Sequence, residues 1–326
     1  MTPNTLDEQL TKYLTDVHAI ELQALAQLEH VPPVAGEEEI SSAFSAHLTE
    51  TEGQERLVAE RLSARDAAPA RAKDAAGKIT GMGFALFAEL QPDTPGKLVA
   101  HAYSYEHMEL AAYDLLAQVA ERAGDAETVQ AAREIEGQER AMAERLAGLF
   151  DRAVDASLDQ LQPESLDEQL NKYLTDAHAI EGQAIQLLQK APQLAGAGQL
   201  AMAYQDHLGQ TEEHQRLIDG RLEARGERPS NLKDAAMRLG ALNWSAFFAA
   251  QPDTPAKLAA FSYAFEHLEI AAYEQLRRVA QRAGDSETED TAERILADER
   301  AAADHVRSQF GAALDATLQE QGLAVS

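Results

Sequence analysis

The amino-acid sequence predicts an all-α protein that consists of two tandem four-helix bundles. Three observations support this prediction. The chain repeats itself at a constant offset of 160 residues: LDEQLTKYLTDVHAIELQAL from Leu6 returns as LDEQLNKYLTDAHAIEGQAI from Leu166, with 16 of 20 positions identical. Hydrophobic residues make up 45% of the chain but aromatic residues only 6%, which is typical of helices packed through small side chains. Apolar residues also recur at alternating spacings of four and three, the period of a helix with one buried face.

The repeat covers both halves of the chain. YEHMELAAY from Tyr105 returns as FEHLEIAAY from Phe265, and the two halves align without an insertion or a deletion. We therefore expect two domains, at residues 1–160 and 161–326. Because no long linker separates them, we also expect the two repeats to pack together as an intramolecular pseudo-dimer.

Each repeat is expected to contain four long helices. In repeat one we place them at residues 7–29, 37–65, 95–123 and 125–151. Thr94 suits the N-cap of the third helix, with Pro95 at its first position, and Gly124 suits its C-cap. A mixed segment with a short helical stretch near residues 70–78 separates the second helix from the third. One long connection at this place is typical of a ferritin-like bundle with a long crossover, rather than an up-down-up-down bundle.

Composition excludes several functions. The formal net charge of -27 argues against nucleic acid and anionic membrane surfaces as partners, since both attract basic patches. The absence of cysteine excludes disulfides, thiolate metal sites and cysteine nucleophiles. No apolar run approaches the ~20 residues of a membrane span, and the first residues show no signal-peptide pattern. We therefore expect a soluble cytoplasmic protein.

Glutamates interrupt the apolar stripes of the helices near mid-height. The stripe of the first helix, for example, is Leu10, Leu14, Val17, Glu21, Ala24 and Leu28. The same spacing places further glutamates on the core faces of the other helices: Glu109, Glu136 and Glu139 in repeat one, and Glu181, Glu269 and Glu299 in repeat two. Several acids are thus predicted to converge inside each bundle.

Converging buried carboxylates need compensation. Burying one ionised carboxylate costs several kcal/mol unless it is paired. No lysine or arginine occupies these stripes near the glutamates, so a bound cation is the simplest compensation, and oxygen-rich sites suit Mn, Fe, Mg or Ca. The alternative is that helix rotation places the glutamates at a solvated edge of the bundle.

Other polar residues recur in both repeats with less certain roles. Glu106 and Glu266 precede Glu109 and Glu269 by three residues and share their helical face, so they suit either ligation or support of a ligand. Glu52 and Glu212 lie beside the stripe of the second helix, where ligation competes with surface ion pairs to arginines at i+4. His18 and His178 precede Glu21 and Glu181 by three residues and suit either ligands or buried hydrogen-bonding groups. His47 and His207 are expected to be structural or surface residues.

The string Thr51-Glu52-Gly53-Gln54, followed by EHMELAAY from Glu106, resembles the YciE/YciF branch of the ferritin-like superfamily, a bacterial stress-associated group. The resemblance covers each repeat. It implies two metal ions per domain, held by single glutamates from helices one and three and by Glu-x-x-His from helices two and four. Carried over by position, the ligands it implies are Glu21, Glu109 and Glu139, with Glu181, Glu269 and Glu299 in repeat two.

The sequence departs from that pattern. No Glu-x-x-His occurs on the second or the fourth helix of either repeat. The fourth helix of repeat one has Glu136-x-x-Glu139, whereas repeat two has Leu296-x-x-Glu299. We therefore expect two iron or manganese ions in repeat one and fewer in repeat two.

Two functions follow from these patterns. The first is a di-metal oxidoreductase of the oxidative-stress type, which acts on dioxygen or peroxide as a ferroxidase or a catalase; no catalytic residue can be assigned within it. The second is a non-enzymatic, stress-induced helical module with degenerate metal sites. A third and weaker alternative is a helical partner of a stress-response protein. Turnover of peroxide or ferrous iron separates the first from the others.

Overall fold

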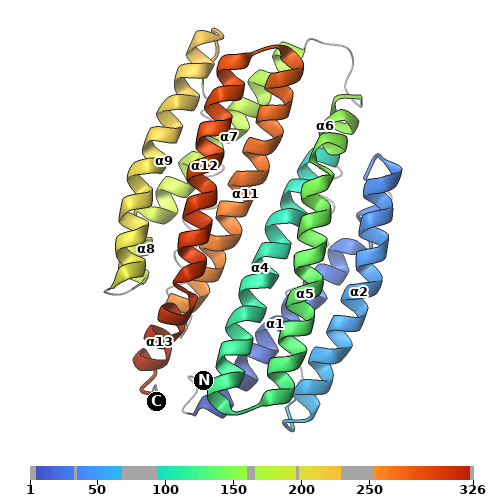
Figure 1. Ribbon diagram of the computed structural model, residues 1–326, viewed down its shortest axis with the longest axis vertical. Coiled ribbons are helices and arrows are strands. Elements are labelled where there is room, and N and C mark those ends of the chain that lie inside the picture. Colours follow the sequence, from blue (N-terminus) through green and yellow to red (C-terminus); the bar gives the residue numbers. More distant parts are fainter. Residues whose placement is uncertain are drawn as a thin grey trace. The chain divides into compact units, whose positions relative to one another are not determined.

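The structure is a computed structural model that describes residues 5–32, 35–67, 94–159, 166–195, 198–228 and 253–323. These residues form helices and short connections, with no strand among them (Figure 1). The helical stretch expected at residues 70–78 lies outside the described residues. The chain divides into two compact units, over residues 1–161 and 162–320, and each is described by itself.

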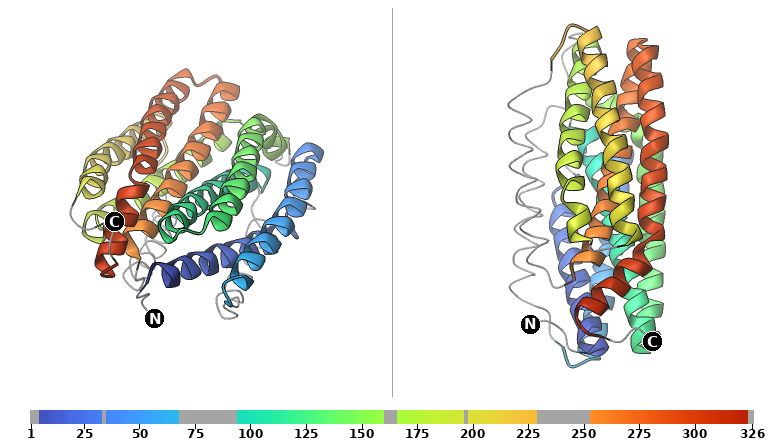
Figure 2. Two further views of the ribbon diagram at one scale, coloured as in Figure 1. Left: turned by 60° about the horizontal axis from the view of Figure 1, so that its bottom comes forward. Right: turned by 90° about the vertical axis from the view of Figure 1, so that its left-hand side faces the viewer.

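Repeat one is a four-helix bundle with one short additional helix. Its elements are α1 (Leu6–Leu28), α2 (Glu38–Ser63), α4 (Thr94–Ala123), α5 (Ala126–Gly148) and α6 (Phe150–Asp159). Helix α1 packs against α2 and α4, and α5 packs against α4 and α2, so the four long helices enclose one core (Figures 1 and 2). Their buried faces carry the apolar residues of the predicted stripes, such as Leu10, Leu14 and Leu116.

The direction of the helices identifies the bundle type. Arg65, just after α2, pairs with Asp7 at the start of α1, and its Nη1 lies 2.8 Å from Oδ2 of Asp125, between α4 and α5. The end of α2 therefore lies beside the end of α4, and α4 begins at the opposite end of the bundle. Helices α2 and α4 run parallel, which confirms the ferritin-like bundle with its long crossover.

Repeat two has the same arrangement. Its elements are α7 (Leu166–Leu188), α8 (Ala191–Leu194), α9 (Gln199–Ala224), α11 (Thr254–Ala283), α12 (Ser286–Ser308) and α13 (Phe310–Glu320). Arg225 pairs with Asp167 at 2.9 Å and with Asp285 at 2.8 Å, as its counterpart does in repeat one. The short helix α8 was not predicted.

The predicted fourth helix is divided. It was expected to run without a break to residue 151, but α5 ends at Gly148 and α6 starts at Phe150. The bend lets α6 reach the start of α4, where the Ser157 hydroxyl accepts a 2.8 Å hydrogen bond from the Gly96 backbone N–H. That N–H lies in the first turn of α4, where backbone donors are satisfied by groups outside the regular helical pattern, and the bend brings one such acceptor to it.

The ends of the third helix are close to the prediction. Gly124 has a φ of 74°, a left-handed conformation that ends α4 after Ala123 as expected. Helix α4 already includes Thr94, one residue earlier than the predicted cap allows. In repeat two the N-cap position belongs to Asp253. Within the described part of the chain, no helix combines the length and apolar character that crossing a membrane requires.

Candidate metal centre

Three of the long helices of repeat one bring a histidine and three glutamates together. We call His47 from α2, Glu106 and Glu109 from α4, and Glu139 from α5 the repeat-one cluster; each offers a ligand atom, and these atoms lie within 4.8 Å of one another. His47 Nε2 lies 3.4 Å from Glu106 Oε1 and 3.6 Å from Glu139 Oε2. All four side chains are buried, with exposed fractions of 3% or less.

Most of the carboxylate oxygens in this cluster have no hydrogen-bond donor. Both oxygens of Glu109, Oε2 of Glu106 and Oε2 of Glu139 are buried without one. No lysine or arginine among the described residues pairs with them. A buried polar group without a partner costs about 1–3 kcal/mol, so the arrangement fits a cation bound by these oxygens.

The fourth long helix supplies Glu21 beside this cluster. Glu21 is fully buried in α1, and its Oε1 accepts a hydrogen bond from the hydroxyl of Tyr113 on α4, while its Oε2 has no donor. Burial raises the pKa of Glu21 to about 8, and the charge of Glu106 adds to the rise. Burial and the neighbouring carboxylates also raise the pKa of Glu109 and Glu139. These pKa values show that the metal-free protein holds protons where a cation would otherwise compensate the charge.

The orientation of His47 leaves one ring nitrogen for a cation. Its Nδ1 lies 3.2 Å from a carboxylate oxygen of Glu50, an acceptor that favours a proton on Nδ1. Nε2 then points its lone pair into the repeat-one cluster, which is the usual arrangement of a metal-binding histidine. Although burial opposes the charged imidazolium, the charge of Glu106 raises the pKa of His47 when no cation is bound.

Repeat two contains the equivalent cluster and a second group of ligands. The repeat-two cluster is His207, Glu266, Glu269 and Glu299, and the second group is Glu181, His214 and Glu299. His207 Nε2 lies 3.0 Å from Glu266 Oε2 and 3.5 Å from Glu299 Oε2. His214 Nδ1 lies 2.8 Å from Glu299 Oε1 and 3.9 Å from Glu181 Oε1. Glu299 therefore belongs to both groups, with one oxygen near each histidine.

Repeat two offers more clustered ligand groups than repeat one, although repeat one was expected to be the richer site. That expectation rested on Glu136, but the carboxylate of Glu136 pairs with Arg133 at 2.7 Å and with Arg140 at 2.6 Å, on the flank of α5. Its replacement by Leu296 therefore removes no ligand from repeat two. Repeat two instead gains His214, where repeat one has Gln54.

Glu52 and Glu212 do not join the clusters. Both are exposed, because their side chains lie on the outer face of α2 and α9. His18 and His178 are buried in α1 and α7, but they face other carboxylates: His18 Nε2 lies 3.0 Å from Glu55, and His178 Nδ1 lies 2.7 Å from Asp219.

The clusters use histidines that the sequence patterns did not identify as ligands. His47 and His207 were expected to be structural or surface residues, and His214 was not considered as a ligand. The buried stripe of α2 consists of Ile40, Phe44, His47, Thr51, Gln54, Val58 and Leu62. From Ile40 to Val58 these residues keep the alternating four-and-three spacing, so polar residues at mid-height on this stripe were the signal that could have identified the site.

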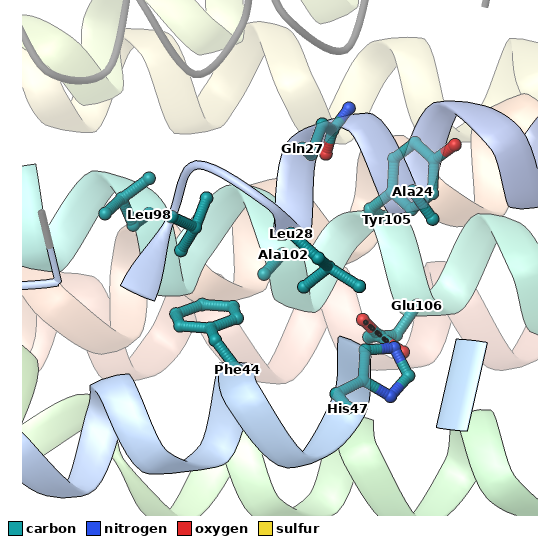
Figure 3. A pocket seen from close by; sticks show the side chains of 10 residues that line it. Ala24, Gln27, Leu28, Phe44, His47, Leu98, Ala102, Tyr105 and Glu106 are labelled. Atoms are coloured by element: carbon teal, nitrogen blue, oxygen red, sulfur yellow. Dashed lines mark ion pairs between the residues drawn. The ribbon is translucent and has the colours of Figure 1, made fainter. Parts of the chain in front are cut away.

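A small cavity adjoins the repeat-one cluster. It has a volume of about 20 Å³, and Figure 3 shows His47 and Glu106 at one side of it, with Phe44, Leu28 and Leu98 among the apolar residues that line it. A space of this size holds about one water molecule. The cavity therefore has room, next to the cluster, for a molecule of only a few atoms.

Comparison with known proteins supports the repeat and the fold. The family model described as "Domain of unknown function (DUF892)" matches the chain twice, at residues 5–159 and 165–319. No solved structure shows significant similarity to the chain.

Proposed function

We propose that this chain, which belongs to the DUF892 family of the ferritin-like superfamily, is a metal-carboxylate protein that acts on dioxygen or peroxide. Within that superfamily we assign it to the stress-associated YciE/YciF branch. Iron and manganese are the ions we propose, because mixed carboxylate and imidazole ligands suit both. The activity is then ferroxidase-like or catalase-like, in a cytoplasmic protein with domains at residues 1–160 and 161–326.

One observation supports this proposal above the others. Carboxylate oxygens converge in the core of each repeat, several of them without a hydrogen-bond donor, and no lysine or arginine of the described residues pairs with them. A structural acid network would be expected to satisfy its acceptors, since unpaired buried polar groups are costly. Several buried oxygens that lie close together without hydrogen-bond donors are suited to bind a cation.

In this proposal the residues of the site have different roles. Iron or manganese, when bound, supplies Lewis acidity and the electrons that reduce dioxygen or peroxide. Glu109 and Glu269 hold the ion, and His47 and His207 supply a nitrogen ligand whose orientation is fixed by the contact at Nδ1. The hydroxyl of Tyr113 holds Glu21 in place. The apolar walls of the cavity in repeat one restrict access to small molecules.

A non-enzymatic module is the second candidate, and one observation favours it. In repeat one the amide of Gln54 donates a hydrogen bond to Glu139 Oε1, so the protein itself satisfies one carboxylate oxygen of that cluster. Such pairing is what a site that has lost its ion would develop. In this case the bundles keep their acids for structure, and one ion or none binds per repeat.

Turnover measurements separate the two candidates. Oxidation of ferrous iron and disproportionation of peroxide are measured for the full chain and for the double variant Glu109→Gln/Glu269→Gln. The matched control is Glu52→Gln/Glu212→Gln, which changes two exposed glutamates of α2 and α9. The proposal predicts turnover that the first variant loses and the control keeps. Equal turnover in all three proteins, or none in the full chain after loading with iron or manganese, supports the non-enzymatic module.

A further inference from the structure

One difference between the two metal centres places a histidine beside the clustered carboxylates of repeat two. Glu21, His47, Glu106, Glu109, Glu139 and Tyr113 recur unchanged in repeat two as Glu181, His207, Glu266, Glu269, Glu299 and Tyr273. Several residues around them change, and the change that adds a potential ligand is Gln54 on α2 to His214 on α9. The difference between the centres therefore depends on what these two side chains do.

In repeat one the glutamine closes the space where a second ion would bind. Its Nε2 donates to Glu139 Oε1 and lies 3.1 Å from Oε1 of Gln138. An amide nitrogen has no lone pair for a metal, and its hydrogen bond occupies Oε1 of Glu139, while Oε1 of Gln54 is buried without a hydrogen-bond donor. Only Oε2 of Glu139 remains free for a cation, on the side of His47.

In repeat two the histidine opens the same space. His214 Nδ1 and Glu299 Oε1 lie 2.8 Å apart, and His214 Nδ1 also lies 3.9 Å from Glu181 Oε1. Two acceptors this close suit a shared cation better than contact with each other. The other oxygen of Glu299 lies 3.5 Å from His207 Nε2, so the carboxylate spans the two histidines.

A second substitution supports this interpretation. The residue before the shared glutamate is Gln138 in repeat one and Asp298 in repeat two. Asp298 Oδ2 lies 3.2 Å from His214 Nε2, so it accepts the proton of that nitrogen and leaves Nδ1 with a lone pair toward Glu299. Gln138 instead accepts from the amide of Gln54. The two positions therefore change together, as a glutamine pair in one repeat and a histidine–aspartate pair in the other.

We propose that the two repeats bind different numbers of ions: one in repeat one, at His47, and two in repeat two, where Glu299 bridges a site at His207 and a site at His214. The proposal rests on the metal-binding function proposed above. Any reaction that requires two neighbouring metal ions is thereby assigned to repeat two. Gln54 and His214 are then the residues that determine the number of ions per repeat.

Titration of the metal-free full chain with Mn²⁺ tests the proposal. Isothermal titration calorimetry gives the number of ions bound, and electron paramagnetic resonance distinguishes an exchange-coupled ion pair from isolated ions. We expect three ions per chain with a coupled pair, and His214→Gln should leave two ions and abolish the coupled signal. The reverse change, Gln54→His with Gln138→Asp, should raise the number to four. His178→Gln is the control, since His178 faces Asp219 outside the clusters.

The outcomes are distinct. Four ions in the unmodified chain, or a coupled signal that survives His214→Gln in a folded protein, overturns the proposal. If His214→Gln fails to fold by circular dichroism, the Gln54→His/Gln138→Asp variant decides, and an unchanged ion count in that variant overturns it. Three ions without turnover of iron or peroxide leave this inference standing and refute the enzymatic function. Turnover together with equal ion counts in both repeats supports the enzymatic function and overturns this inference.

Discussion

Replacing Glu109 with leucine should stabilise the metal-free protein. Glu109 is buried, and neither of its carboxyl oxygens has a hydrogen-bond partner. A buried polar group without a partner costs about 1–3 kcal/mol, so exchanging this carboxyl group for an apolar side chain of similar volume removes a cost of that size. For units of this size, a gain of about 2 kcal/mol raises the melting temperature by about 4–8 °C. We therefore expect the metal-free variant to melt several degrees above the unmodified chain.

The same variant should lose the response of repeat one to metal. An ion present at about 100 times its dissociation constant stabilises the native state by about 2.7 kcal/mol, provided that it binds only the folded form. Without Glu109 this stabilisation disappears from repeat one. The assay is thermal unfolding followed by far-ultraviolet circular dichroism, in the presence of a chelator and then with Mn²⁺.

Glu136→Leu is the matched control, because repeat two naturally carries Leu296 at this position. Glu136 lies in the same helix as Glu139 but pairs with Arg133 and Arg140. Both arginines are partly exposed, and such ion pairs contribute about 0–1 kcal/mol. The control should therefore change the metal-free melting temperature little and keep the metal response. The reasoning is refuted if Glu109→Leu destabilises the metal-free protein and leaves its response to Mn²⁺ unchanged.

Three further predictions concern repeat two. Burial raises the pKa of Glu181 to about 8 and of Glu299 to about 7, from the usual 4.5 of a glutamate, so the folded metal-free protein keeps protons that the unfolded chain releases. This contribution to stability is complete below pH 4.5 and is lost as the pH rises to about 8, by up to about 1.4 kcal/mol per pH unit and proton; urea unfolding that shows constant or rising stability over this range contradicts it. Tyr273→Phe removes the hydroxyl that donates a hydrogen bond to Glu181. This change should weaken Mn²⁺ binding about 10–100-fold, as measured by calorimetry. Unchanged affinity would show that this hydrogen bond does not position the ligand. Asp285→Ala removes the side chain that caps α12 by accepting a 3.0 Å hydrogen bond from the Thr288 N–H. The free energy of unfolding, measured in urea, should fall by about 1–2 kcal/mol, and the number of bound ions should stay the same. A lower ion count would mean that the end of the bundle controls the site.

Much of the fold could be predicted from the sequence because its signals are local. The long helices follow from spacing, and the end of α4 follows from Gly124, whose φ of 74° ends the helix. The division between α5 and α6 could not be predicted in this way. It depends on Ser157 reaching the start of α4, which is a contact between residues 61 positions apart in the chain.

The site shows the same limit. Glu21, Glu109 and Glu139 were identified because apolar neighbours define their stripe clearly. On α2 the choice between Glu52 and Gln54 depends on helix rotation, since two residues turn the helix by about 200°. The sequence signal on α2 was ambiguous, and the exposed Glu52 was chosen over the buried stripe of His47 and Gln54. Packing of α2 against α1 and α5 decides which of these faces the core.

The most direct test of the central claim, that the buried carboxylates hold metal, is the metal content of the full chain. The protein is purified without chelator, loaded with iron or manganese, and analysed by elemental analysis beside the Glu109→Leu/Glu269→Leu variant. The account predicts ions that remain bound to the unmodified chain through gel filtration and are lost from the variant. Equal metal content in the two folded proteins, or none in either, would contradict it.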